Sequence, residues 1–376
     1  MPRAGTGRAW ELIMATRAPS RLAAGVLVSS LVACGDPGAV TSSDEVVGGA
    51  AAERVASHCV IAEGDRCRMV EPRDVATFAS GAVQMPGFTY LANGALAALG
   101  TRSSDRRIVS STSADLVSFT PVETLPWLAG DVTGADVGGR KTLYFTSRID
   151  ATVGLFASAL EGLVVHPPVP VTLEGSPVVV PYWPQAVGLE DGRTLLGFVE
   201  PQKRAFLAVD DGSGTRFRVG PWPNVSGDLR GVLAHVGTTA SGAWVITHQS
   251  ANADWRFSSF VQISTDEGAS WSSPRNVEPN DPDVHDAFPI ARADAGADLY
   301  YLHMAGPGEF VVHRRALHED GTLGPAEQVT SGAVGHIEKP QARRLPDGRI
   351  ALSFAARRPG EVYDLAIAYL AGDAPP

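Results

Sequence analysis

The stretch Ser264-Thr265-Asp266-Glu267-Gly268-Ala269-Ser270-Trp271 combines hydroxyls, carboxylates, a glycine and an indole in one short segment. Asp266 can accept hydrogen bonds from backbone N–H groups of its own turn, and Ser264 can add another. Gly268 can adopt the left-handed conformation that a tight turn requires, and Trp271 offers a large apolar surface for packing. We therefore predict that the stretch is a hairpin turn whose polar groups stabilise the turn itself.

Comparable turns with acidic and small residues recur along the chain. They lie near Asp115, Glu161, Asp211, Asp266, Asp320 and Asp373, at intervals of 46 to 55 residues. A repeat of this length indicates a chain built from copies of one supersecondary unit that stack on each other. The repeat, and not the single turn, therefore determines the expected architecture.

A second hairpin precedes each acidic turn. The clearest pair is PQAVGLEDGRTLLGF at 184–198 and PQARRLPDGRIALSF at 340–354, each a strand, an Asp-Gly turn and a strand. Two hairpins make a four-stranded sheet, so the repeats predict an all-β, six-bladed β-propeller. The last repeat lacks an outer strand, and we expect residues near 69–80 to supply it and close the ring. A jelly roll or a two-domain sandwich is the alternative.

The N-terminal region has the features of an export signal. From Met14, the expected start, two arginines precede an apolar run from Leu22 to Ala33. The sequence ending at Cys34 resembles the bacterial lipoprotein box, which implies that Cys34 is lipidated; an ordinary signal peptide is the alternative. We expect a signal peptide at 1–33, a tether at 34–68 and the propeller at 69–376. Gly35 favours anchoring at the outer rather than the inner membrane.

Two further cysteines, Cys59 and Cys67, lie close together in the expected tether. In an exported chain such a pair indicates one small disulfide loop. A zinc site would need more ligands than these thiols and His58 supply. We expect neither a metal nor another cofactor.

The charge of the chain restricts its partners. The net charge is −10, and removal of four arginines and one glutamate with residues 1–33 would bring it to about −13. A surface this acidic argues against nucleic acid, and an anionic ligand would need a local arginine cluster. We expect a monomer that meets the membrane only through its lipid anchor.

The stretch 264–271 matches the pattern Ser-x-Asp-x-Gly-x-x-Trp position for position, and 113–119 is a shortened form. It resembles the Asp-box of the sialidase (BNR-repeat) superfamily. The resemblance implies a sialidase-like propeller in which such boxes lie on outer hairpins, away from the substrate, so the box residues are expected to be structural. Active sialidases carry an Arg-Ile-Pro motif, which this sequence lacks, so exo-sialidase activity is not expected.

Candidate functional residues are those that the repeats place at the propeller mouth, where the innermost strands begin. Expected ligand contacts are Tyr182, Trp183, Arg230 and His285, and the expected carboxylates are Asp286 and Glu338. Two facing carboxylates suit glycoside hydrolysis, one as acid and one as base or nucleophile. Asp286, Glu338 and Tyr182 are expected at equivalent repeat positions, and Arg292 and Arg343 are expected to be able to approach the mouth.

Three functions follow from these residues. The favoured one is a surface lipoprotein whose propeller mouth binds a glycan or another envelope ligand. The second is a glycoside hydrolase related to sialidases, with Asp286 and Glu338 as the reacting pair. The third is a scaffold for another protein, because propellers support all three.

Overall fold

The computed structural model describes residues 61–370, apart from 64–65, 71–74, 80–82, 103, 177–179, 201–203, 225–232, 253–255, 281–282, 293–294, 307–308, 332–335, 346–347 and 358–362. The described residues form strands, turns and connections without a helix. None of the described residues belongs to a helix that is long and apolar enough to cross a membrane.

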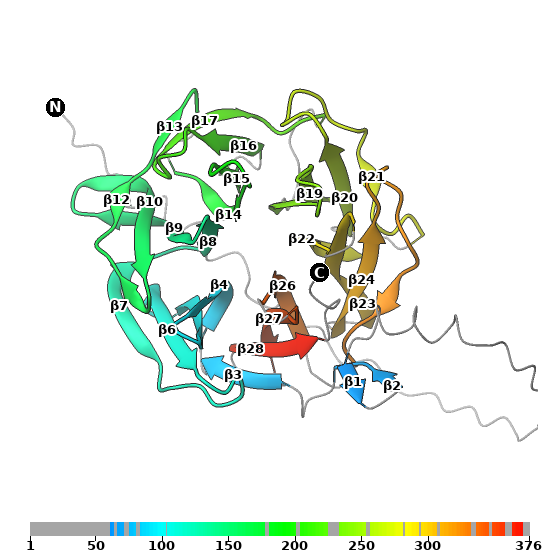
Figure 1. Ribbon diagram of the computed structural model, residues 1–376, viewed down its shortest axis with the longest axis horizontal. Helices are drawn as coiled ribbons and strands as arrows, with labels where there is room; N and C mark the ends of the chain where they lie inside the picture. Colours follow the sequence, from blue (N-terminus) through cyan, green and yellow to red (C-terminus); the bar gives the residue numbers. More distant parts are fainter. Residues whose placement is uncertain are drawn as a thin grey trace, which may run out of the picture. The chain divides into compact units, whose positions relative to one another are not determined.

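Six sheets of four or five strands follow one another around a central axis as the blades of a propeller (Figure 1). Blade 1 comprises β4 (Val83–Ala92), β5 (Ala95–Arg102), β6 (Arg107–Ser113) and β7 (Glu123–Leu128), and blade 2 comprises β8 (Val132–Val137), β9 (Arg140–Ile149), β10 (Thr152–Glu161), β11 (Val164–Val165) and β12 (Val169–Pro170). Blade 3 comprises β13 (Thr172–Glu174), β14 (Tyr182–Gly188), β15 (Thr194–Val199), β16 (Ala205–Asp210) and β17 (Arg216–Pro221), and blade 4 comprises β18 (Ala234–Thr238), β19 (Trp244–Ala251), β20 (Phe257–Ser264) and β21 (Arg275–Asn276). Blade 5 comprises β22 (Val284–Ala291), β23 (Ala297–Gly306), β24 (Glu309–Leu317) and β25 (Glu327–Gln328), and blade 6 comprises β26 (His336–Arg344), β27 (Ile350–Arg357), β28 (Tyr363–Leu370) and β3 (Val75–Ala79). A separate hairpin joins β1 (Ile61–Glu63) and β2 (Arg66–Arg68).

The propeller is closed by pairing the two ends of its chain. β3 pairs antiparallel with β28, with Thr77 opposite Ala366 and Val75 opposite Ala368. The expectation that residues near 69–80 supply the outer strand of the last blade is therefore confirmed. Val70, just before β3, is fully buried, and its N–H donates to the carbonyl of Val329 at 2.7 Å.

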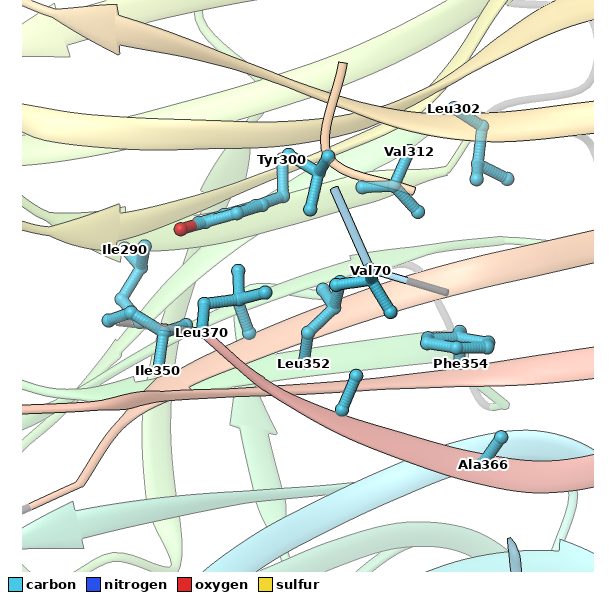
Figure 2. Packing of buried hydrophobic residues seen from close by; sticks show 13 residues of the cluster. Val70, Ile290, Tyr300, Leu302, Val312, Ile350, Leu352, Phe354, Ala366 and Leu370 are labelled. Carbon is cyan, nitrogen blue, oxygen red and sulfur yellow. The ribbon is translucent and has the colours of Figure 1, made fainter. Parts of the chain in front are cut away.

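The core lies between the blades, because each sheet buries both of its faces. Between blades 5 and 6, side chains such as Tyr300, Val312, Leu352 and Phe354 pack together around Val70 (Figure 2). All six residues of β15, Thr-Leu-Leu-Gly-Phe-Val, are buried, which explains why this strand has no polar alternation. Inter-blade burial therefore supplies the main stabilisation.

The acidic turns connect the third and fourth strands of the blades, as the repeat predicted. Asp115, Asp211, Asp266 and Asp320 follow the third strands of blades 1, 3, 4 and 5, and Glu161 ends that of blade 2. The sixth turn, near Asp373, lies outside the described residues.

Glycines let the innermost strands converge on the axis. A Cβ on Gly188 of β14 would lie 2.0 Å from the carbonyl oxygen of Asp136, and one on Gly134 would lie 2.4 Å from the Phe88 ring. A Cβ on Gly237 would meet Pro289 at 2.8 Å. Any side chain at these positions would force neighbouring inner strands apart.

We predict that Gly188→Ala destabilises the protein by about 1–3 kcal/mol or more, because a backbone carbonyl cannot move aside as a side-chain tip can. The matched control is Gly220→Ala in β17, where an added Cβ meets nothing within 4 Å. The control should shift stability by less than about 0.5 kcal/mol. Urea unfolding midpoints measure both, and equal midpoints for the two variants would contradict the crowded axis.

Candidate functional site

The innermost strands of blades 3, 5 and 6 each contain a β-bulge near the end where the strand begins. The pairs on either side of the bulges are Tyr182–Val199 and Gln185–Gly197 in blade 3, His285–Leu302 and Phe288–Tyr300 in blade 5, and Glu338–Ala355 and Gln341–Ser353 in blade 6. Glu338 therefore corresponds to Tyr182 and to His285, whereas Asp286 corresponds to Trp183. The predicted equivalence of Asp286 with Glu338 and Tyr182 was wrong by one residue, which changes the direction of a strand side chain.

Asp286 is the first extra residue of the β22 bulge. It is 6% exposed, its φ is 51°, and its N–H donates to Oε1 of Gln249 at 3.1 Å. Trp183 occupies the same place in β14 with a φ of 49°, and its N–H donates to Oδ2 of Asp131 at 3.3 Å. A left-handed conformation costs a non-glycine residue about 1–3 kcal/mol, so the preceding blade holds both bulges in a strained state.

Blade 4 holds the beginning of β22 with three buried polar side chains, Thr247, Gln249 and Ser259, which we call the β22 clamp. Thr247 Oγ1 donates to the carbonyl of Ala287, and Ser259 Oγ donates to that of Val284 at 3.1 Å. Sequence reasoning missed these residues. The available signal was the alternation of Thr247 and Gln249 within the buried strand β19, where polar residues need specific partners.

His285 lies among aromatic and charged groups. Its ring centroid is 4.3 Å from that of Phe257 and 5.1 Å from that of Phe310. Its Nε2 is 3.8 Å from Oδ1 of Asp283, whose Oδ2 is 3.9 Å from Nη1 of Arg256. The start of β22 thus gathers an imidazole, a carboxylate and a guanidinium beside two aromatic rings.

Tyr182 and Trp183 form the corresponding start of β14. Both are half-buried and pack against the apolar cluster between blades 3 and 4. Burial raises the pKa of the Tyr182 hydroxyl, and the nearby Asp131 carboxylate raises it further. The phenol is therefore a neutral hydrogen-bonding group at physiological pH.

Several predicted positions lie outside the described residues. These are Arg230, Cys34 and Cys59, together with the side chains of Glu338 and Cys67. The carboxylate pair of Asp286 and Glu338 and the disulfide loop therefore stay predictions.

Two arginines expected near the mouth lie elsewhere. Arg292 follows the end of β22, with its Nη1 3.7 Å from Oδ1 of Asp298. Arg343 lies near the end of β26, in a cavity on the propeller axis. That expectation was wrong because both residues come from the ends of inner strands, and the mouth is where these strands begin.

The axial cavity has a volume of about 240 Å³ and is lined by the innermost strands of all six blades. Its polar and aromatic lining includes Phe88, Thr89, Asp136, Phe288, Gln341 and Arg343. Apart from Arg343, the residues predicted for the mouth do not contribute to it. It extends from residues that flank the bulges, such as Phe288 and Gln341, toward the hairpin-turn ends of the strands.

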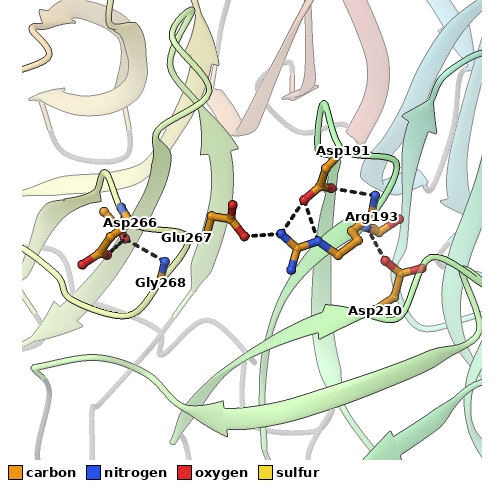
Figure 3. Close-up of polar contacts among 8 residues, drawn as sticks. Asp191, Arg193, Asp210, Asp266, Glu267 and Gly268 are labelled. Atoms are coloured by element: carbon orange, nitrogen blue, oxygen red, sulfur yellow. Dashed lines mark hydrogen bonds and ion pairs between the residues drawn. The ribbon is translucent and has the colours of Figure 1, made fainter.

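The stretch 264–271 forms a turn that is held by its own hydrogen bonds (Figure 3). One of its residues also contacts the neighbouring blade. Asp266 accepts the Ser270 N–H at 2.8 Å and hydroxyl at 2.6 Å, which lowers the pKa of its carboxyl group. Gly268 has a φ of 86° and its N–H donates to Ser264 Oγ, while Trp271 Nε1 donates to the Gly268 carbonyl at 3.2 Å. The Asp266 side chain is thus engaged within its own turn.

The next residue of the turn, Glu267, reaches the neighbouring blade. Its Oε2 accepts from Nη2 of Arg193 at 2.6 Å, and Arg193 Nε also donates to Oδ2 of Asp191 at 2.6 Å (Figure 3). These groups join the outer hairpin of blade 4 to the inner hairpin of blade 3.

Within the described part of the chain, no group of three or more His, Cys, Asp and Glu side chains is arranged to hold a metal ion.

Comparisons with known proteins agree on the fold. No protein-family model and no curated protein matches the sequence. Among solved structures, a protein of unknown function from Dyadobacter fermentans is 16% identical, with a TM-score of 0.62 over 81% of this chain and 99% of that one. A mutant Trypanosoma rangeli sialidase with trans-sialidase activity is 12% identical, with a TM-score of 0.51 over 80% of this chain and 57% of that one. A leech intramolecular trans-sialidase is 10% identical, with a TM-score of 0.53 over 78% and 68%.

These likenesses show the fold. The protein is a six-bladed propeller of the kind found in sialidases. At such low identity they carry no information on activity.

Two buried histidines of blade 4 should make the protein sensitive to acid. Burial lowers the pKa of His235 to about 3 and that of His248 to about 4. The unfolded chain binds these protons near pH 6.5, so stability is complete above that pH and falls as pH decreases toward the folded-state values. Between pH 7.5 and pH 5 the burial of each histidine should lower the free energy of unfolding by roughly 2 kcal/mol.

Urea unfolding at several pH values measures this loss. His248→Phe, which keeps an aromatic ring against Phe260, should reduce the pH dependence, whereas His318→Gln at an exposed turn should not. A wild-type midpoint that stays constant from pH 7.5 to pH 5 would contradict the buried neutral state of these rings.

Proposed function

We propose that the protein binds a carbohydrate at the end of the propeller where the innermost strands begin. The observation that carries this proposal is the start of β22, where His285 packs against the rings of Phe257 and Phe310. Asp283 lies close to both His285 and Arg256. Sugar hydroxyls exchange hydrogen bonds with carboxylate, imidazole and guanidinium groups. The apolar C–H face of a sugar ring packs against aromatic side chains.

The strained backbone supports the same location for the binding site. Asp286 and Trp183 are held in left-handed conformations by Gln249 and Asp131 of the preceding blades. Such strain is retained where it positions functional groups. The proposal includes Tyr182, Trp183 and Arg230 as further ligand contacts, and membership of the Asp-box superfamily, which rests on the sequence pattern at 264–271.

Binding to an array of bacterial-envelope and host glycans tests the proposal. We expect at least one glycan to bind, and His285→Ala and Asp286→Asn to weaken binding by about tenfold or more. The first removes a hydrogen-bonding group, and the second replaces a charged acceptor with a neutral amide, each worth about 1.5 kcal/mol. Asp320→Asn, in the outer turn of the same blade, is the matched control and should bind as wild type does. Absence of any glycan binding, with the fold intact by circular dichroism, would favour the scaffold function instead.

Hydrolysis is the second candidate, because Asp286 is a buried carboxylate on an innermost strand. In this function Asp286 and Glu338 act as the acid and the base or nucleophile. Aryl glycosides, including an aryl sialoside, would then release their aryl group, and the Asp286→Asn, Glu338→Gln variant would not. Glycan binding without aryl release assigns the protein to the binding function.

The proposal also places the protein at the cell surface, exported and lipid-anchored through Cys34, with the outer membrane favoured. Expression in a Gram-negative host tests this. Cys34→Ser should move the protein from the membrane fraction to the soluble fraction and remove the acyl mass from its N-terminal peptide. Cys59→Ser is the control and should leave the protein in the membrane. Wild-type protein without an acyl group at Cys34 would contradict lipidation.

A further inference from the structure

Arg343 places a guanidinium in the axial cavity without using its hydrogen-bond donors. Its Cζ lies 4.5 Å from the centroid of the Phe88 ring, and its Nη2 lies 3.6 Å from Oδ2 of Asp136, beyond hydrogen-bond distance. Among the described residues, none accepts a hydrogen bond from this group. The side chain is 29% exposed and lines the cavity.

The adjacent Arg344 shows what a structural arginine does in the same strand. Its Nη2 donates to the carbonyl of Ala291 at 3.0 Å, and its Nη1 donates to that of Gly348 at 3.2 Å. Arg344 therefore ties blade 6 to blade 5 through backbone oxygens. Arg343 has no comparable acceptors and is the arginine available to a ligand.

The cavity carries an excess of positive charge. Its lining contains two arginines, Arg343 and Arg344, and one aspartate, Asp136. The Oδ2 atom of Asp136 is also 3.3 Å from Nζ of Lys141, so one carboxylate is shared between two cations. This local excess lies inside a chain whose net charge is −10. Burial lowers the pKa of the Arg343 guanidinium, because its charged form is incompletely solvated, and a bound anion would relieve that cost.

Neutral donors complete the surroundings. Thr89 of β4 and Gln341 of β26 line the cavity, and neither side chain forms a hydrogen bond with another described residue. The volume of about 240 Å³ is below the ~300–1,000 Å³ typical of sites for larger organic ligands. The planar fork of an arginine matches two oxygens of a carboxylate or a phosphate.

We propose that the axial cavity is a binding site for a compact oxyanion, phosphate or a small carboxylate, with Arg343 as the charged ligand and Thr89 and Gln341 as neutral donors. The site is independent of the carbohydrate site proposed at the mouth. Its occupant would contact blade 1 and blade 6, and blade 6 is the sheet in which the two ends of the chain pair. Binding should therefore raise the melting temperature of the closed propeller.

Thermal shift and isothermal titration of the full chain test the site, with inorganic phosphate and acetate as probes and sodium chloride at matched ionic strength as reference. We expect phosphate or acetate to stabilise the protein more than chloride does, and the preferred probe identifies the class of ligand. Arg343→Gln should abolish the effect. Arg343→Lys should weaken binding by about tenfold, since the charge remains and the second hydrogen bond is lost.

The Asp136→Asn variant should change the affinity for an oxyanion in the opposite direction. It removes the competing charge while keeping an oxygen that can accept the Gly139 N–H, so it should tighten oxyanion binding. Arg216→Gln, at an exposed ion pair, is the control for loss of one positive charge and should bind as wild type does. The proposal is overturned if chloride stabilises equally, if Arg343→Gln folds and still binds, or if Asp136→Asn weakens binding.

Discussion

The pairing of β3 with β28 is the interaction on which the rest of the structure depends. It gives blade 6 its outer strand, and it converts a row of six sheets into a ring in which every sheet has a neighbour on each side. An open row would leave the apolar faces of its two end blades in water. Val70 extends the same closure into the core between blades 5 and 6, where its side chain and both of its backbone groups are engaged.

Closure also explains the composition of the innermost strands. Six strands that converge on one axis must approach closely, and Gly134, Gly188 and Gly237 provide the room at three of them. Where a larger residue faces the axis, it defines the cavity. Arg343 and Phe88 are the clearest cases, with the guanidinium stacked over the ring. The geometry that brings the inner strands together therefore also creates a partly charged cavity at the centre of the propeller.

Much of the fold was predictable from the sequence because its signals are local and repeated. Asp-Gly hairpins, acidic turns about fifty residues apart and a missing last strand led to the blade count and to the closure of the ring. The site was less predictable. The sequence of β22 resembles that of β26 only weakly, so the repeat alignment was shifted by one residue and matched Asp286 to Glu338 instead of Lys339. The β22 clamp and the axial position of Arg343 depend on which blade follows which in space, and no spacing within one repeat encodes that.

The order in which the strands are made has a consequence for folding. β3 is synthesised before every other blade strand, yet its partner β28 is the last strand of the propeller to be made. Until residues 363–370 are available, β3 is an unpaired edge and blade 6 is incomplete. This contact has the longest sequence separation in the sheet network, and such contacts form late because the intervening chain must be ordered first. The strand that secures the finished ring is therefore exposed for longest during its assembly, and the nascent chain is most vulnerable to wrong pairing at that edge.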